Sequence, residues 1–349
     1  MATYSATESN RPIVGATILL LFGLLMASLD ITGAQIGVCY GMNGNNLPSR
    51  QDVVDLYKSQ NIQRMRLYSP DQEALQALSG SDIGIILGVP NDALQGISSS
   101  TSTANNWVQN NVVAYSSVNF RYIAVGNEVS PVNGNSQYIN YVLPALQNIH
   151  SAIASAGLQI PVTTAVETGL LGTSYPPSQG VFRDDVSSYI DPIISFLAQN
   201  GAPLLVNVYP YFSYKDNTGS IPLSYALFTS SSVVVQDQYS NLGYQNLFDA
   251  LVDAVYSALE NAGGSNVGIV VSESGWPTAG GTDTTVDNAK TYNNNLIQHV
   301  KSGTPKKSGS LETYVFAMFD ENEKTGGGEE QHWGIFTPDK QAKYQISFS

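Results

Sequence analysis

Short runs of consecutive apolar residues recur along the chain from residue 36 onwards, and stretches long enough for a helix separate them. Several of these stretches carry apolar residues at helical spacing, as in Leu247, Leu251, Val255 and Leu259. Apolar runs without polar alternation are typical of strands buried on both faces, as in parallel sheets. The pattern therefore predicts alternating strands and helices, with strands at 36–40, 65–68, 84–89, 122–125, 162–166, 204–209, 267–271 and 313–319.

Eight such strand and helix units are the number that builds a (β/α)8 TIM barrel. The rival fold, a doubly wound open sheet, would more often show five or six strands and a G-x-G-x-x-G turn after the first one. Here the first strand leads into the polar loop 41–46 instead. The widest gap between strands, 211–266, predicts an insertion after strand six. No linker or charge block divides the chain, so we expect a single domain at 35–349.

The N-terminal segment has the pattern of a signal peptide. An apolar run at 13–29 follows Arg11 and gives way to Asp30 and then to the small residues Thr32, Gly33 and Ala34. We predict cleavage after Ala34, with a membrane-anchoring signal as the alternative because the run could just span a bilayer. The sequence therefore predicts secretion. The absence of an evident C-terminal tail favours the extracellular space or cell wall over the vacuole.

Charge is scarce and mostly negative. Only 12% of the 349 residues are charged, and 15 basic against 28 acidic residues give a net charge of -13. This balance argues against nucleic-acid binding, which relies on basic groups, and against anionic membrane surfaces. The 20 tyrosines and 31 glycines, with many Asn, Ser and Gln, suit an uncharged polyhydroxylated ligand instead.

Metal and disulfide chemistry find little support. The one cysteine, Cys39, cannot form an intramolecular bridge, and it lies in an apolar stretch typical of a buried small residue. His150, His299 and His332 are scattered without metal-ligand spacing. We therefore predict that the protein uses neither a metal nor another cofactor.

Carboxylates follow three of the predicted strands. Glu128 comes after strand four, Glu273 after strand seven and Glu321 after strand eight. In a barrel of this class the reactive groups sit at the carboxyl ends of the strands, so these side chains meet at one rim. A carboxylate pair across the barrel mouth is what glycoside hydrolysis needs. We predict Glu128 as the acid/base and Glu273 as the nucleophile, with crowding of like charges keeping Glu128 protonated.

Aromatic residues near the strand ends are candidates for stacking on sugar rings, whose C–H bonds pack against aromatic faces. Asn127, beside Glu128, is the best polar candidate for binding a sugar hydroxyl. The predicted aromatic sugar-binding residues are Tyr40, Tyr209, Phe212, Trp276 and Phe319, with Tyr211 and Trp333 as further candidates.

Four motifs carry a family resemblance: GVCYG at 37–41, GNE at 126–128, SESGWP at 272–277 and FAMFDEN at 316–322. They closely resemble the plant endo-β-1,3-glucanases of glycoside hydrolase family 17, and the resemblance extends over 35–349. It implies a TIM barrel that hydrolyses internal linkages of β-1,3-glucan with retention, Glu128 as acid/base and Glu273 as nucleophile.

The resemblance also implies that Glu321, Lys324 and Glu330 lie near the active site. The three glycines at 326–328 depart from the family pattern, so Glu329 is the alternative to Glu330. We expect a monomer that acts in plant defence or cell-wall turnover. A mixed-linkage 1,3-1,4-β-glucan hydrolase and a non-catalytic carbohydrate-binding barrel remain the alternatives.

Overall fold

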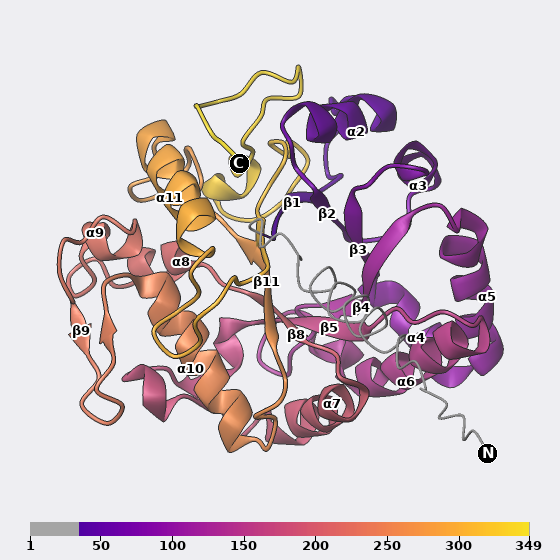
Figure 1. The fold of residues 1–349 in the computed structure, drawn as a ribbon, viewed down its shortest axis with the longest axis horizontal. Coiled ribbons are helices and arrows are strands. Elements are labelled where there is room, and N and C mark those ends of the chain that lie inside the picture. The colour runs from indigo at the N-terminus through magenta and orange to yellow at the C-terminus, as the bar shows by residue number, and fades with distance from the viewer. Residues whose placement is uncertain (1–34, 349) are drawn as a thin grey trace, which may run out of the picture. The chain divides into compact units, whose positions relative to one another are not determined.

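A closed barrel of parallel strands forms the centre of residues 35–348, the part of the chain that this computed structural model describes. Neighbouring strands follow the order β1-β12-β11-β8-β5-β4-β3-β2 around the barrel, and Figure 1 shows the sequence from β2 through β3, β4, β5 and β8 to β11. This confirms the predicted (β/α)8 barrel, whereas the predicted signal peptide, 1–34, lies outside the described residues. The barrel strands are β1 (Ile36–Tyr40), β2 (Arg64–Leu67), β3 (Gly84–Val89), β4 (Asn119–Asn127), β5 (Val162–Glu167), β8 (Leu204–Asn207), β11 (Ile269–Ser274) and β12 (Thr313–Val315).

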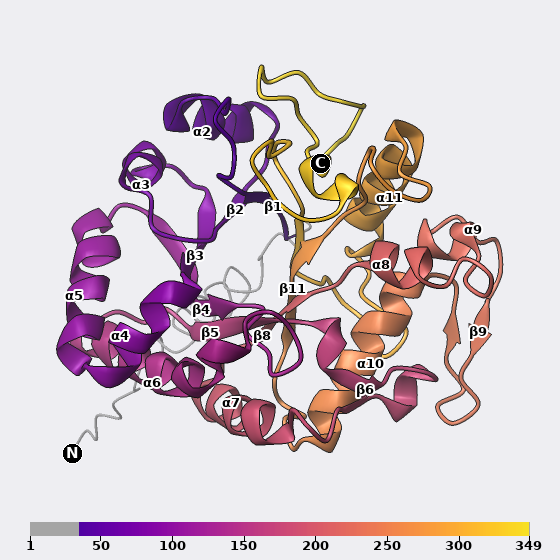
Figure 2. The same cartoon turned by 180° about the vertical axis from the view of Figure 1, so that it is seen from behind.

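Helices surround the barrel, as Figures 1 and 2 show from opposite sides. Polar side chains cap several of them: the Ser49 and Asp71 side chains accept hydrogen bonds from the first-turn N–H groups of α2 and α3, and Asn246 does so for α10. None of the helices within residues 35–348 has the length and apolar character that a membrane span needs. The surrounding helices are α2 (Arg50–Ser59), α3 (Gln72–Leu78), α4 (Leu94–Ser99), α5 (Thr101–Asn111), α6 (Ile139–Ser155), α7 (Ser187–Asn200), α10 (Leu247–Asn261) and α11 (Val286–His299).

The ends of β11 and β12, which carry or adjoin the predicted catalytic residues, differ from the prediction. β11 runs to Ser274, so Glu273 belongs to the strand rather than to the loop after it. β12 ends at Val315, but the chain continues along the barrel: the N–H of Phe316 donates to Ser274 O (2.8 Å) and that of Met318 to Cys39 O (2.8 Å). The strand that carries Glu273 therefore extends further than its apolar run predicted, whereas the regular part of β12 is shorter than the predicted 313–319.

The predicted insertion after strand six is confirmed. It contains α8 (Pro210–Lys215), α9 (Leu223–Ala226) and the antiparallel pair β9 (Val235–Gln236) and β10 (Gly243–Tyr244), before the chain enters α10. A second excursion, after β5, was not predicted. It contains the antiparallel pair β6 (Leu171–Thr173) and β7 (Val181–Phe182).

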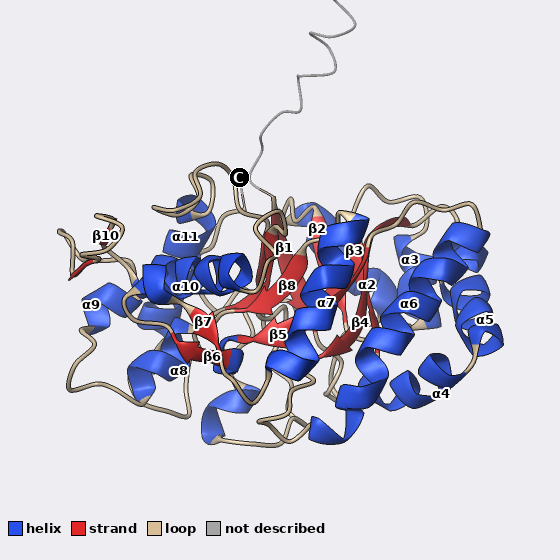
Figure 3. Ribbon diagram, turned by 90° about the horizontal axis from the view of Figure 1, so that it is seen from below, coloured by secondary structure: helices blue, strands red, loops and turns tan. Residues whose placement is uncertain are grey.

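Asp237 joins these two excursions. Its carboxylate accepts hydrogen bonds from the N–H and hydroxyl of Ser178 in one excursion (2.8 and 2.9 Å) and from the N–H of Tyr239 and Ser240 in the other (2.9 and 3.2 Å). Figure 3 shows both small strand pairs on the same side of the barrel, next to α10. A buried carboxylate therefore holds together two segments that the sequence separates.

Candidate active site

Irregularities interrupt both strands that carry the predicted catalytic carboxylates. The register of β4 against β5 shifts between Ala124 and Asn127, and that of β11 against β8 shifts between Val271 and Glu273. A bulge of this kind breaks the strict alternation of faces and re-aims side chains. As a result, the adjacent residues Asn127 and Glu128 both line the cleft at the barrel mouth.

The backbone of Glu128 has an unusual conformation. Its φ of 49° is left-handed, two residues after Gly126 at φ 80°, and for a residue with a Cβ this costs about 1–2 kcal/mol. The surroundings hold it there: the Glu128 N–H donates to Ala165 O (2.9 Å), and its carbonyl accepts from Nδ2 of Asn133 (2.7 Å) and Asn135 (3.2 Å). The strained residue thus has every backbone polar group satisfied.

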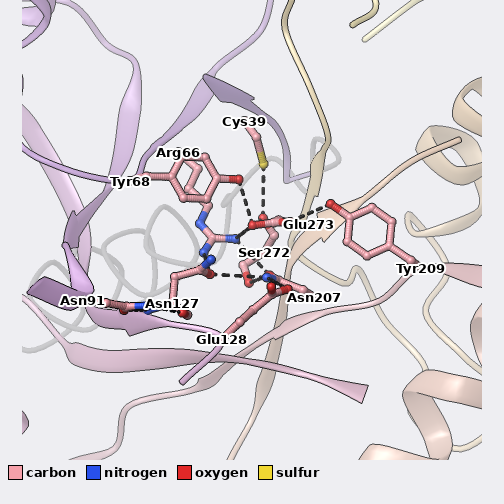
Figure 4. A network of polar contacts seen from close by, with 10 residues as sticks. All are labelled: Cys39, Arg66, Tyr68, Asn91, Asn127, Glu128, Asn207, Tyr209, Ser272 and Glu273. Carbon is pink, nitrogen blue, oxygen red and sulfur yellow. Dashed lines mark hydrogen bonds and ion pairs between the residues drawn. The ribbon is translucent and has the colours of Figure 1, made fainter. Parts of the chain in front are cut away.

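Three donors hold the carboxylate of Glu273 (Figure 4). Oε1 accepts from Nη1 of Arg66 (2.8 Å) and from the hydroxyl of Tyr68 (2.8 Å), and Oε2 accepts from the hydroxyl of Tyr209 (2.6 Å). Arg66 is itself only 1% exposed. These three donors fix both oxygens of the Glu273 carboxylate in position, as a nucleophile requires.

Arg66 and Asn207 connect the two carboxylates. Nη1 of Arg66 also donates to Oδ1 of Asn207 (2.9 Å) and to Ser272 O (3.0 Å), and Nη2 donates to Oδ1 of Asn127 (2.6 Å). Nδ2 of Asn207 then donates to Oε1 of Glu128 (2.8 Å). One network therefore sets the positions of Glu273 and Glu128 relative to each other, as Figure 4 shows.

The environment of Glu128 favours its neutral form. Burial, and next the negative charge of Glu273, raise the pKa of Glu128 from 4.5 to about 7, against the opposing hydrogen bond from Asn207. Glu167, at the end of β5, adds a smaller contribution in the same direction. The site thus combines a carboxyl group whose pKa is raised to about 7 with a second carboxyl group that three donors fix in position, two environments suited to an acid and its catalytic partner.

A cleft extends to both sides of these carboxylates. Two adjoining cavities share Glu128, Glu273, Phe316 and Lys324 in their linings. Within residues 35–348, no group of three or more His, Cys, Asp or Glu side chains is arranged to hold a metal ion. One cavity is further lined by Tyr40, Gly41, Met42, Asn43, Tyr68, Ser69, Asn127 and Glu321, and the other by Glu167, Thr168, Gly169, Asn207, Tyr209, Phe212, Ser213, Glu330 and Trp333.

Comparison with known proteins identifies the family. The sequence model of glycosyl hydrolases family 17 matches residues 36–348. The chain belongs to this family. As a family 17 glycosyl hydrolase, it is 62% identical over 347 residues to a glucan endo-1,3-beta-glucosidase of Vitis vinifera, with 99% of this chain and 100% of the relative covered. It is 53% identical to a glucan endo-1,3-beta-glucosidase of Nicotiana tabacum, with 97% of each chain covered.

Solved structures agree with this placement. A beta-1,3-glucanase and pollen allergen of Cryptomeria japonica superposes on the family 17 hydrolase with a TM-score of 0.87 at 50% identity, covering 90% of this chain and 99% of the other. A plant beta-glucan endohydrolase, from a study of two such enzymes with distinct substrate specificities, gives 0.86 at 48% identity, covering 89% and 100%.

Most of the predicted site residues of the hydrolase lie along the cleft. They reach it from different strand ends, as expected for a TIM barrel. Tyr40 and Asn127, however, also have partners within the protein: Arg50 donates to the Tyr40 hydroxyl (2.9 Å), and Asn127 Oδ1 accepts from Arg66. The residues that line the cleft as predicted are Tyr40, Asn127, Glu128, Tyr209, Phe212, Glu273, Glu321, Lys324, Glu330 and Trp333.

Trp276 and Phe319 do not line the cleft, and their prediction as sugar-binding residues is wrong. Trp276 is completely buried: its ring packs edge-on against Tyr211, which is also buried, and its Nε1 donates to Asp283 O (3.0 Å). Phe319 is buried against the ring of Tyr40. Because both rings are buried among other aromatic side chains, neither leaves a face free for a sugar.

The structure distinguishes Glu329 from Glu330, the two adjacent residues of the loop after β12 that the sequence offered as alternatives near the active site. Glu330 lines the cleft and forms an ion pair with Lys324 (3.1 Å), whereas Glu329 is buried and forms an ion pair with Lys215 of α8. Glu330 is therefore the residue that faces the cleft. Glu321 accepts a hydrogen bond from the N–H of Asn43, and burial raises the pKa of its carboxyl.

Four functional residues escaped the sequence interpretation: Arg66, Tyr68, Asn207 and Glu167. Arg66 and Asn207 lie inside the runs 65–68 and 204–209, whose apolar character predicts strands. A charged or amide side chain in a strand expected to be buried on both faces is itself a signal, because such groups are buried only when they have partners. Glu167 ends β5 just as Glu273 lies near the end of β11, and the same reasoning on strand ends would have found it.

Proposed function

We propose that this family 17 hydrolase cleaves internal 1,3-β-D-glucosidic linkages by a retaining double displacement. The observation that carries the proposal is the pair of carboxyl groups in one cleft with opposite environments, Glu128 with its raised pKa and Glu273 held by three donors. The names of the relatives from Vitis vinifera and Nicotiana tabacum support 1,3-β-glucan as the substrate.

In the first step Glu128 donates its proton to the glycosidic oxygen while Glu273 attacks the anomeric carbon. The bond between that carbon and the oxygen breaks, and the leaving chain departs as an alcohol. In the second step Glu128, now a carboxylate, accepts a proton from water, whose oxygen displaces Glu273 from the anomeric carbon. Two inversions give net retention. Arg66 and the two tyrosines that hold Glu273 keep the nucleophile oriented in both steps.

An endo mode of attack agrees with the shape of the cleft. The carboxylates lie where the two cavities meet, with aromatic and amide side chains on either side. A polymer chain can therefore extend in both directions from the bond that is cleaved, and no chain end is needed at the reacting carboxylates.

Hydrolysis of a linear β-1,3-glucan tests the proposal. We expect new reducing ends, an early fall in viscosity, and β-configured product as the first anomer seen by NMR. Glu273→Gln should abolish all three, whereas Glu73→Gln, an exposed residue of α3, should leave them unchanged. Faster cleavage of a mixed-linkage glucan would favour the 1,3-1,4 alternative. Binding without cleavage by the unmodified protein would favour a carbohydrate-binding barrel.

We further propose that residues 1–34 are a cleaved signal peptide and that the enzyme acts outside the cell, in wall turnover or defence. The apolar run at 13–29 and the small residues before Gln35 support this. Mass spectrometry of the protein recovered from the extracellular fluid of plant cells should show Gln35 as its first residue. Recovery with an intact N-terminus, or only from the vacuole, would contradict it.

A further inference from the structure

The direction of the Glu128 side chain depends on its strained backbone. Because φ and ψ fix where the Cα–Cβ bond points, a return of Glu128 from φ 49° to an ordinary conformation would swing its carboxyl away from the present position. Left-handed residues of this kind persist only where the surroundings enforce them. The groups that enforce the conformation of Glu128 therefore control where its proton is delivered.

Asn133 makes the shortest side-chain hydrogen bond to the backbone of Glu128. Its Nδ2 lies 2.7 Å from the Glu128 carbonyl, against 3.2 Å for Nδ2 of Asn135. Oδ1 of Asn133 accepts from the N–H of Asn135 (2.9 Å), so the two asparagines act as one unit of the loop between β4 and α6. Asn133 does not line the cleft cavities. It contacts the backbone carbonyl of Glu128 rather than the side chain that reaches into the cleft.

Glu167 fixes the orientation of the Asn133 amide. The same Nδ2 donates to Oε1 of Glu167 (2.8 Å). The carbonyl of Glu128 and the carboxylate of Glu167 are both acceptors only, so a flipped amide would face them with its own oxygen. The bond to a carboxylate is also charge-assisted and stronger than a neutral one. Since Glu167 is the last residue of β5, the strand next to β4, this bond ties the loop to the barrel rim.

We propose that Asn133 and Glu167 are positioning residues for the acid/base: Asn133 holds the backbone of Glu128 in its left-handed conformation, and Glu167 locks the Asn133 amide. The proposal rests on the proposed function, because it takes Glu128 as the proton donor.

A misplaced acid leaves a characteristic kinetic signature. A poor leaving group, such as the sugar hydroxyl of a glucan, needs the proton, whereas 2,4-dinitrophenolate departs without one. We therefore compare kcat/KM, which reports the first displacement, on linear β-1,3-glucan and on a 2,4-dinitrophenyl β-1,3-glucobioside. For Asn133→Ala we expect a fall of about 10- to 100-fold on the glucan, and a change of less than about threefold on the dinitrophenyl substrate.

Glu167→Ala should show the same selectivity with a smaller loss, because the Asn133 amide would remain. If Glu167 acts through Asn133, the double variant should match Asn133→Ala within about twofold rather than multiply the two losses. Glu167→Gln, which keeps an acceptor oxygen, should retain more activity on the glucan than Glu167→Ala. This variant also serves if Asn133→Ala does not fold.

Asn111→Ala is the matched control. Its amide donates to the Trp107 carbonyl (2.9 Å) on α5, the same kind of bond away from the cleft, and neither rate should change. Equal losses on the two substrates, no loss on either, or multiplying losses in the double variant would overturn the proposal. If the unmodified protein cleaves neither substrate, the proposed function has failed instead.

Discussion

The raised pKa of Glu128 makes the free energy of unfolding of the enzyme depend on pH. Comparison with the variant Glu128→Gln, which cannot ionise at this position, measures that dependence. Burial and the charge of Glu273 raise this pKa from 4.5 to about 7 in the folded protein, whereas in the unfolded chain it returns to its ordinary value. Between these two pH values the unfolded chain has released the proton that the folded protein still holds. The free energy of unfolding therefore falls as the pH rises through this interval, and the glutamine variant removes that loss.

The size of the effect follows from the two pKa values. Each pH unit between them corresponds to about 1.4 kcal/mol, so ionised Glu128 costs about 3 kcal/mol at pH 8. Below pH 4 both proteins are neutral at this position, and their difference reports only altered hydrogen bonds, such as the one from Asn207. We expect Glu128→Gln to gain about 3 kcal/mol relative to the parent between pH 4 and pH 8, or about 5 °C in Tm.

Urea unfolding of the parent and the variant at five pH values from 4 to 8, at fixed ionic strength, measures this difference. Groups that titrate in both proteins cancel, and Glu73→Gln, on the exposed face of α3, provides a control whose difference from the parent should stay flat. A difference for Glu128→Gln that stays constant within about 1 kcal/mol over this range would refute the raised pKa. The electrostatic reason for assigning Glu128 as the acid would then be lost.

Three further substitutions test other parts of the structure. Arg66→Ala should lower the free energy of unfolding by about 3–5 kcal/mol in urea, because it leaves Glu273 without its buried cation; the exposed Arg183→Ala should have little effect, and similar values for the two would contradict this. Trp276→Ala should destabilise by about 3–5 kcal/mol but leave the KM for glucan unchanged below its melting temperature, and a raised KM would restore Trp276 as a sugar-binding residue. Asp237→Ala should leave four donors without their acceptor and lower the free energy of unfolding by about 1–3 kcal/mol. It should also expose the segment 230–246 to limited proteolysis, and unchanged proteolysis would show that other contacts hold the two excursions together.

The barrel was predictable because most of its strands contain short, largely apolar runs, such as Gly84–Val89 and Ile269–Val271, which recur between stretches of helical length. The excursion that contains β6 and β7 was not, since strands of three and two residues are too short to produce a periodic pattern. The tie that Asp237 makes between the two excursions joins residues about sixty positions apart, and no local pattern encodes it.

Within the site, the positions of the catalytic carboxylates could be predicted from the strand ends. Which of their neighbours point into the cleft depended on backbone details that the sequence pattern does not show. Counting alternation from Glu273 in β11 places Ser274 and Trp276 on the outer face, where both contact Tyr292 of α11. Trp276 does follow the strand as predicted, but its side chain turns towards α11 rather than towards the cleft. At Asn127 and Glu128 alternation fails for a different reason, since the bulge and the left-handed backbone bring adjacent side chains to the same cleft.

The left-handed end of β4 limits how this chemistry can be transplanted. An engineer who copied Gly126, Asn127 and Glu128 onto a regular strand of another barrel would obtain the right residues with the acid pointing to the wrong face. The transferable unit also includes the irregular register and the asparagines that grip the carbonyl from the following loop. In enzyme design, therefore, the unit to graft is this backbone conformation together with the side chains that hold it, because the Gly-Asn-Glu sequence alone does not reproduce it.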